Sequence, residues 1–358
     1  MDFAFTEEQT AIQDMALDFA KEQIAPHALE WDETGHFPVD VIRQTAELGM
    51  GAIYVPEDHG GSGLKRLDGA IIFEALSYGC PTVAAYISIH NMVAWMVSKY
   101  ASDAQRERWL PKLATMEWLS SYCLTEPHCG SDAAALSTRA EKRGDTYVLN
   151  GAKQFISGAG TSDFYFVFAR TSDDGARGIS AFAIEKDAPG LGFGANERKM
   201  GWNAQPTRQV ILENCEVPAE NLIGREGEGF RFAMSGLDGG RINIGACSLG
   251  AAWSALDKTR DYIFERKAFG RELAAFQAMQ FRVADMASDL DASRLMIWRA
   301  ADALDRADPN ATRYSAMAKR YATDLGFEIC NQALQAHGGY GYLKDYGLEK
   351  LVRDLRVH

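Results

Sequence analysis

The stretch Tyr122–Asp132, YCLTEPHCGSD, begins as an apolar β-type run and breaks at Thr125-Glu126-Pro127. Small and polar residues follow the break, among them Gly130 and Ser131. A strand that ends in this way leaves backbone N–H groups and hydroxyls free, and these can bind ring carbonyls, ring nitrogens or a pyrophosphate. From these residue types alone, a strand leading into an ordinary turn is the simpler interpretation.

The sequence on either side of this stretch divides into three regions, and 358 residues are long for a single core. Residues 1–118 are predicted to be helical, with a capping box at Thr6 and Gln9. Residues 119–226 carry β-type runs between turns, as in a small barrel or sandwich; the runs are Thr146–Leu149, Phe164–Arg170, Ile179–Glu185 and Thr207–Leu212. Residues 227–358 are again helical. The prediction is an α+β protein with an N-terminal helical domain, a middle β-domain and a C-terminal helical bundle, and with a cleft where they meet.

Composition excludes several classes of partner. The net charge of −12 argues against nucleic acid, which needs basic patches. No apolar run approaches the length of a membrane span. The six cysteines form no C-x-x-C pair, which favours reduced thiols and no metal site. No secretory or transit segment precedes the first helix, so we expect a bacterial cytoplasmic protein, although a mature mitochondrial matrix form would look the same.

Three further motifs have residues suited to a cofactor. NGAKQFISG, residues 150–158, places Phe155 and Ser157 two apart on a strand, where an aromatic ring can stack on a planar group. ERKAFGR, residues 265–271, is followed by Phe276 and Gln277 and offers a guanidinium for a pyrophosphate. QAHGGYGY, residues 335–342, has paired glycines that permit close backbone approach. Each motif alone also fits a core phenylalanine, a solvated charge run or a helix C-cap.

Together, the four motifs resemble the acyl-CoA dehydrogenase family, in the family's order and over nearly the whole chain. Further stretches, such as GWNAQPTR at 201–208 and GLDGGRINIGACSLGAA at 236–252, resemble the branch of the family that oxidises isobutyryl-CoA. The resemblance implies FAD as cofactor. It implies that one group of residues holds the flavin within the subunit, namely Tyr122, Cys123, Leu124, Thr125, Ser131, Phe155, Ile156 and Ser157. A second group would reach FAD across a dimer interface, namely Arg266, Phe269, Phe276, Gln277, Gln335, Gly338 and Gly339.

The resemblance also implies an acyl-CoA site, a reaction and partners. The substrate site would include Ser131, Leu237, Asp238, Gly239, Gly240 and Arg241. Asp238 and Arg241 would meet CoA, although residues three apart on a helix can instead form an internal ion pair. A carboxylate would remove the α-proton while the β-hydride passes to the flavin, yielding a 2,3-enoyl-CoA. From isobutyryl-CoA the product would be methacrylyl-CoA, a step of valine breakdown. Electrons would leave to an electron-transferring flavoprotein, and the family precedent is a homotetramer.

The chain departs from the family pattern at the catalytic base. The family's usual base is a glutamate that follows a segment resembling Arg353–His358, so we expect it just after His358 and assign no catalytic residue within the chain. The alternative base position is occupied by Gly240, and Glu349 resembles a position outside the active site. His128-Cys129 replaces the small residues usual in the loop, and Ala268 lacks a polar side chain common there.

The sequence is compatible with several substrates and with more than one function. The pocket floor is expected on the helix that contains Ser88, His90 and Met92, but one methylene is worth only about 1–3 kcal/mol of discrimination. 2-Methylbutyryl-CoA and butyryl-CoA are therefore alternative substrates. An acyl-CoA oxidase, which hands electrons to oxygen, is a second enzyme reading. A non-catalytic acyl-CoA or flavin-binding relative is a third.

Overall fold

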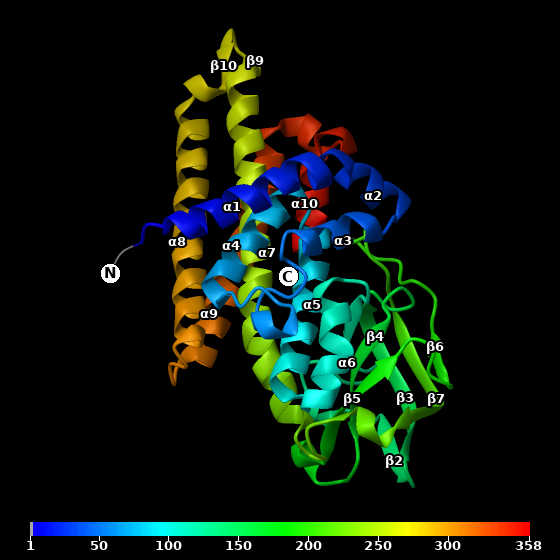
Figure 1. Ribbon diagram of the computed structural model, residues 1–358. Helices are drawn as coiled ribbons and strands as arrows, with labels where there is room; N and C mark the ends of the chain where they lie inside the picture. Colours follow the sequence, from blue (N-terminus) through cyan, green and yellow to red (C-terminus); the bar gives the residue numbers. More distant parts are fainter. Residues whose placement is uncertain (1–2) are drawn as a thin grey trace.

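Helices form the N-terminal region of the computed structural model, which describes residues 3–358 (Figure 1). They are α1 (Glu7–Phe19), α2 (Ala28–Thr34), α3 (Val39–Glu47), α4 (Arg66–Gly79), α5 (Pro81–Tyr100) and α6 (Asp103–Ala114). The predicted capping box is present, because the Thr6 hydroxyl accepts from the Gln9 N–H and the Gln9 side chain accepts from the Thr6 N–H. This exchange satisfies two N–H groups that have no partner within the helix.

The middle region is one mixed sheet of eight strands in the order β6-β7-β3-β2-β4-β5-β8, with β1 paired to β4. The strands are β1 (Ser120–Cys123), β2 (Arg139–Arg143), β3 (Thr146–Ser157), β4 (Phe164–Arg170), β5 (Ile179–Glu185), β6 (Leu191–Phe193), β7 (Thr207–Pro218) and β8 (Leu222–Ile223). β1 runs parallel to β4, with Tyr122 opposite Phe166. In the described residues no other strand pairs with β1, and side chains use part of its second edge, since the Ser120 N–H donates to His90 Nδ1 and the Ser120 carbonyl accepts from the Tyr86 hydroxyl.

Strand β4 separates two cores because its side chains alternate between the faces of the sheet. Phe164, Phe166 and Phe168 pack in a cluster with α5, α6 and the start of α7 (Gly229–Glu265). Tyr165 and Val167 pack in the other cluster, inside the β-domain. All five side chains are buried, which explains why this strand reads as a continuous apolar run.

The C-terminal region is a bundle of long helices. α7 is followed by a small hairpin, β9 (Lys267–Ala268) and β10 (Arg271–Glu272), and then by α8 (Gln277–Asp305), α9 (Ala311–Ala336) and α10 (Leu348–Leu355). The 37 residues of α7 correspond to about 55 Å. α7 therefore runs from the β-domain to the hairpin at the far end of the molecule (Figure 1). Among the helices of residues 3–358, none is both long and apolar enough to span a bilayer.

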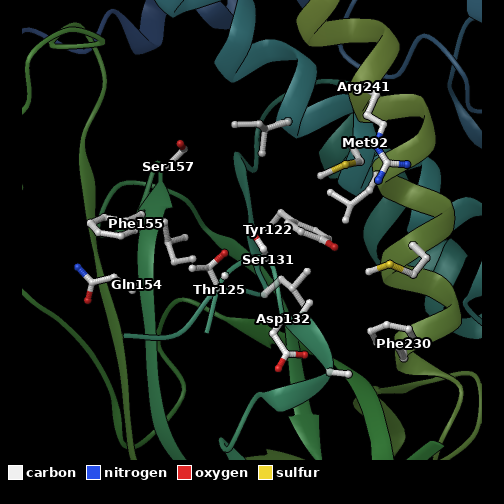
Figure 2. A pocket seen from close by; sticks show the side chains of 18 residues that line it. Met92, Tyr122, Thr125, Ser131, Asp132, Gln154, Phe155, Ser157, Phe230 and Arg241 are labelled. Carbon is white, nitrogen blue, oxygen red and sulfur yellow. The ribbon is translucent and has the colours of Figure 1, made fainter. Parts of the chain in front are cut away.

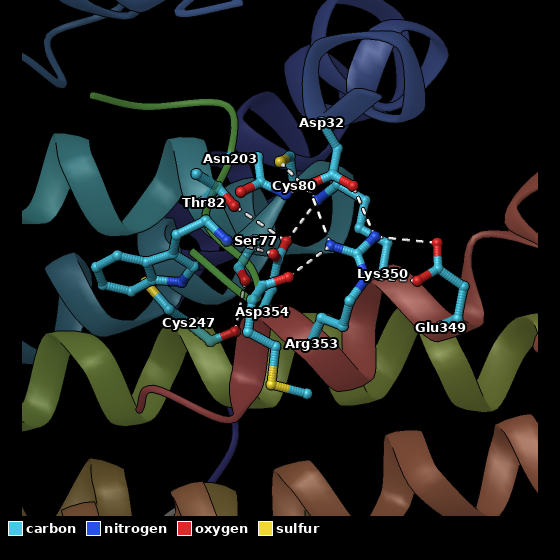
Figure 3. A network of polar contacts seen from close by, with 12 residues as sticks. Asp32, Ser77, Cys80, Thr82, Asn203, Cys247, Glu349, Lys350, Arg353 and Asp354 are labelled. Atoms are coloured by element: carbon cyan, nitrogen blue, oxygen red, sulfur yellow. Dashed lines mark hydrogen bonds and ion pairs between the residues drawn. The ribbon is translucent and has the colours of Figure 1, made fainter. Parts of the chain in front are cut away.

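A buried polar network fixes α10 where the three regions meet (Figure 3). The Asp354 carboxylate accepts from Lys350 Nζ at 2.5 Å, from the Thr82 hydroxyl of α5 at 3.0 Å and from the Trp202 backbone N–H at 2.7 Å. Asp354 is fully buried and Lys350 almost so. A buried ion pair is stable only when its remaining hydrogen bonds are made, and these partners make them.

Candidate active site

A cavity of about 710 Å³ lies between the edge of the β-domain and helices α5 and α7 (Figure 2). One wall comes from β1, β3 and the loop after β1, and the other from the two helices. Its lining residues are Ile89, Met92, Tyr122, Leu124, Thr125, Gly130, Ser131, Asp132, Ala133, Ala134, Gln154, Phe155, Ile156, Ser157, Phe230, Met234, Leu237 and Arg241. Of the first, intrasubunit group predicted for FAD, all but Cys123 line this cavity.

Cys123 faces away from the cavity because side chains alternate along β1. Tyr122 and Leu124 line the cavity, whereas the Cys123 side chain is fully buried in the core of the β-domain. Burial raises the pKa of the Cys123 thiol well above its usual range. Only the backbone of Cys123 can therefore face a ligand in the cavity.

The loop after β1 is held by a buried ion pair. Lys153 Nζ lies 2.7 Å from Glu126 Oε1, and both side chains are almost completely buried. The same carboxylate accepts from the Ser137 N–H at 2.7 Å and from the Thr138 N–H at 3.0 Å. Burial alone would raise the pKa of Glu126, but Lys153 and these hydrogen bonds outweigh it and lower the pKa to about 2. The loop that carries Thr125 and its neighbours is thereby fixed at both ends.

Phe155 is exposed beside the cavity in a strained backbone conformation. Its φ is 59°, in the left-handed region, and 62% of the side chain is exposed. The register between β3 and β7 shifts between Lys153 and Ile156, and this bulge turns Phe155 out of the sheet. Because strained backbone positions cluster at ligand sites, the exposed ring of Phe155 is a candidate ligand contact. Figure 2 shows Phe155 on the same side of the cavity as Thr125 and Ser157.

The opposite wall includes a stripe on α7. Phe230, Met234, Leu237 and Arg241 line the cavity at spacings of four, three and four, which places them on one helix face. Only Leu237 and Arg241 belong to the predicted site. The helical spacing that places Phe230 and Met234 on the same face is visible in the sequence. The same applies to Asp132 and Gln154, which flank predicted residues and also line the cavity.

Asp238 is engaged within the protein. Its carboxylate accepts from the Arg241 guanidinium and, at 2.6 Å, from the Thr312 hydroxyl of α9. This is the internal ion pair that the spacing allowed as an alternative. Arg241 lines the cavity whereas Asp238 does not, so Arg241 is the member of the pair that is placed to meet a ligand, with Asp238 holding its guanidinium.

The second group of predicted FAD residues lies elsewhere. Arg266, Gln335, Gly338 and Gly339 line a separate pocket of about 430 Å³ at the far end of α7. A side chain added at either glycine would meet no atom within 4 Å; the φ of 59° at Gly338 favours glycine there, whereas nothing in this subunit demands glycine at Gly339. Such open glycines are suited to close approach by a ligand or partner.

The remaining three residues of this group do not line either pocket. Phe269 sits at the tip of the hairpin, 95% exposed and with a φ of 53°. Its ring centre lies 6.1 Å from that of Phe276, which precedes Gln277 at the start of α8. From Leu237 to Arg266 is 29 residues of helix, or about 43 Å. One subunit therefore does not bring the two groups together.

A possible metal-ligand set in the loop proves to be occupied. Ligand atoms of Glu126, His128 and Cys129 lie within 4.8 Å of one another. The Glu126 oxygens, however, already accept hydrogen bonds from Lys153 and from the backbone and side chain of Ser137. The Cys129 thiol is buried, which raises its pKa, so the residue behaves as a packed hydrophobe.

Neither Glu349 nor His358 is placed for acid–base chemistry in the cavity. Glu349 accepts from the Arg353 guanidinium in the network of Figure 3. His358 is held between the Trp202 indole N–H, 3.2 Å from Nε2, and the Ser248 hydroxyl, 2.6 Å from Nδ1. Burial lowers the pKa of His358 to about 3, so the ring is neutral. Among the described lining residues, Asp132 is the only carboxylate, and its side chain is exposed at the rim.

Comparisons with known proteins now connect this geometry to a family. Three family models match in order: the acyl-CoA dehydrogenase N-terminal domain over residues 6–117, the middle domain over 121–215 and the C-terminal domain over 227–358. The chain belongs to the acyl-CoA dehydrogenase family. The predicted three-part fold is thereby confirmed, and so are the oxidoreductase class and FAD as the cofactor of that class.

Individual relatives are similar over nearly the whole chain. Mitochondrial isobutyryl-CoA dehydrogenase of Dictyostelium discoideum is 56% identical over 99% of this chain and 85% of its own length. The Bos taurus enzyme of the same name is 55% identical over the same shares. The structure of butyryl-CoA dehydrogenase from Megasphaera elsdenii superposes with a TM-score of 0.97 at 36% identity, covering 100% of this chain and 94% of that one. The predicted likeness to the isobutyryl-CoA branch is therefore confirmed.

Proposed function

We propose that this protein oxidises a short branched acyl-CoA, isobutyryl-CoA, to methacrylyl-CoA with FAD as acceptor. The observation that carries the proposal is the cavity itself. One of its walls is a polar strand edge that bears Phe155, and the opposite wall is a mainly apolar surface of α5 and α7. A planar cofactor fits the first wall and a short acyl chain the second. The 55–56% identity to isobutyryl-CoA dehydrogenases favours this substrate over 2-methylbutyryl-CoA or butyryl-CoA.

The residues of the strand edge fit the isoalloxazine end of FAD. Thr125, Phe155 and Ser157 line the cavity and would hold the ring through the Thr125 hydroxyl, the aromatic face of Phe155 and the Ser157 hydroxyl. Ser131 lies between Gly130 and Asp132 in a loop whose N–H groups suit a pyrophosphate. FAD, when bound, supplies the acceptor for the β-hydride. The chain's part is to orient the two reactants and to exclude water from between them.

The FAD site is proposed to be completed by a second subunit, within a homotetramer. Arg266 and Gln335 lie at the opposite end of α7 from the cavity, so one cofactor can meet both groups only across an interface. The exposed Phe269 would cover the adenine in the partner's site. We also propose that the three domains meet at the predicted boundaries, after residues 118 and 226.

The substrate's thioester is proposed to lie between the strand edge and Arg241, with the acyl chain directed toward Met92 and Leu237. Hydrogen bonds to the thioester oxygen would stabilise the enolate that develops as the α-proton leaves. The base is proposed to follow His358, because Arg353–His358 resembles the family segment that precedes it. The buried network at Asp354 and the contacts of His358 hold this segment in place.

Electrons are proposed to leave to an electron-transferring flavoprotein, in the bacterial cytoplasm or, as for the named relatives, in mitochondria. The test is product analysis by mass spectrometry after incubation with isobutyryl-CoA and that acceptor. Formation of a product two hydrogens lighter, with little oxygen uptake when the acceptor is left out, supports a dehydrogenase. Fast oxygen uptake would support an oxidase instead, and no product from any short acyl-CoA would support a non-catalytic relative.

A further inference from the structure

Two methionines of α5 occupy notches that glycines leave in α7. A side chain added at Gly240 would lie 3.3 Å from Met92 Sδ, and one added at Gly236 would lie 2.8 Å from Met96 Sδ. Glycine inside a helix is unfavourable relative to alanine, so these positions need a reason. The reason here is close approach of the two helices, because each sulfur lies too near for a β-carbon to be added without crowding.

The two methionines differ in what lies on their other side. Met92 lines the cavity, and Figure 2 shows it between α7 and the ring of Tyr122. Met96 is fully buried and does not line the cavity. One helical turn thus separates a methionine that a ligand can touch from one that it cannot.

A buried cation, Arg66, packs against α7 at Gly239, next to the glycine that Met92 contacts. The Arg66 guanidinium carbon lies 3.9 Å from the ring centre of Tyr54 and 4.6 Å from that of Trp95. A side chain added at Gly239 would come within 2.5 Å of Arg66 Nη1, so this stack presses directly on α7. The two aromatic rings hold the guanidinium in place, so this part of α7 is rigidly packed.

We propose that Met92, seated against Gly240, is the residue that limits acyl-chain length in this protein. The inference rests on the proposed acyl-CoA oxidation and names the side chain that sets its substrate range. Methionine is long and unbranched, so its terminal methyl fills the end of the cavity without a polar group. A branched four-carbon acyl group then fits in front of Met92, whereas an unbranched chain of six carbons meets it.

The test compares Met92→Ala with its matched control Met96→Ala. Both changes remove the same atoms from the same helix beside an α7 glycine, but only the first enlarges the cavity. For Met92→Ala, the ratio of kcat/KM for hexanoyl-CoA to that for isobutyryl-CoA should rise at least ten-fold, on the order of what one or two methylenes are worth. Met96→Ala should keep the parent's ratio. The ratio of Kd values for the two enoyl-CoA products, from calorimetry, should shift in the same way without turnover.

A second variant approaches the same contact from α7. Gly240→Ala places a methyl group against the Met92 sulfur and pushes the side chain toward the cavity. The helix propensity gained with alanine and the crowding against Met92 oppose each other, so its melting temperature should stay close to the parent's, yet the ratio of kcat/KM for propionyl-CoA to that for isobutyryl-CoA should rise at least three-fold. This variant keeps the question open to measurement if Met92→Ala fails to fold.

The outcomes separate this proposal from the function on which it rests. If the parent oxidises isobutyryl-CoA but all three variants keep its chain-length profile, or both methionine variants shift it equally, the role of Met92 is wrong and the function stands. If the parent neither oxidises nor binds any short acyl-CoA, the function itself is wrong, and the inference fails with it.

Discussion

The buried pair between Lys153 and Glu126 should determine whether the loop after β1 can hold a flavin. Lys153→Met keeps the length and apolar stem of the side chain but removes the ammonium, 2.7 Å from Glu126 Oε1. It leaves a carboxylate, 1% exposed, that still accepts from the Ser137 and Thr138 N–H groups. Loss of one partner from a buried pair typically costs about 3–5 kcal/mol.

The effect should appear first in the loop and in cofactor affinity. Since Lys153 is the main group that lowers the pKa of Glu126, the variant should take up a proton at this site or open the loop. Hydrogen exchange at the Ser137 and Thr138 amides should accelerate by at least 100-fold, on the order of 3 kcal/mol of local stability. FAD affinity, measured by flavin fluorescence, should fall at the same time.

The control is the double variant Lys153→Met with Glu126→Gln, which removes the unpaired charge. It should recover part of the lost protection, because a neutral amide costs less to bury than a carboxylate. The reasoning would be refuted if Lys153→Met left exchange and FAD affinity unchanged, or if the double variant were less protected than the single one.

Three other predictions follow from the same geometry. Phe155→Gly relieves the strained φ of 59°, so the free energy of unfolding should stay equal or rise, while the Kd for FAD should increase at least ten-fold. An unchanged Kd for FAD in calorimetry would exclude Phe155 from the site. Burial lowers the pKa of His90 to about 4, below its usual 6.5, so its contribution to stability is complete above pH 6.5 and declines as pH falls toward 4. The parent should lose about 2 kcal/mol of unfolding free energy from this group between pH 7.5 and 5.0, and denaturation curves of His90→Gln should lack that part of the slope; parallel pH profiles would contradict it. Co-expression of Phe155→Ala with Arg266→Glu should restore about one quarter of the flavin sites if each site takes one group from each subunit, and no recovery would rule out the shared site.

Local pattern predicted the fold better than it predicted strand lengths. Phe164–Arg170 and Ile179–Glu185 were predicted with the bounds that β4 and β5 have, because each is a buried run between turns. Thr146–Leu149 was too short, since β3 continues to Ser157. Asn150-Gly151 resembles a turn in the sequence, but Gly151 adopts a φ of 149° at a register shift and carries the strand onward.

Only part of the candidate site was predicted, because local sequence does not show which helix face borders a cavity. The motifs located the strand edge, where loop residues bear the polar groups, but the apolar wall contains residues that resemble ordinary core. Phe230 and Met234 have the period of a buried helix face, and only the tertiary structure shows that this face borders a cavity. The role of Gly240 also depends on a neighbour, Met92, that lies 148 positions away in the sequence.

The measurement that tests the central claim most directly is an anaerobic absorbance titration of the purified protein with isobutyryl-CoA. The account predicts a bound flavin whose visible band bleaches as the thioester is added, since the cavity brings a flavin and a short acyl chain together. A folded protein that shows no flavin band even after FAD is added would contradict the account. A band that no short acyl-CoA bleaches would contradict the proposed reaction while leaving the flavin site in place.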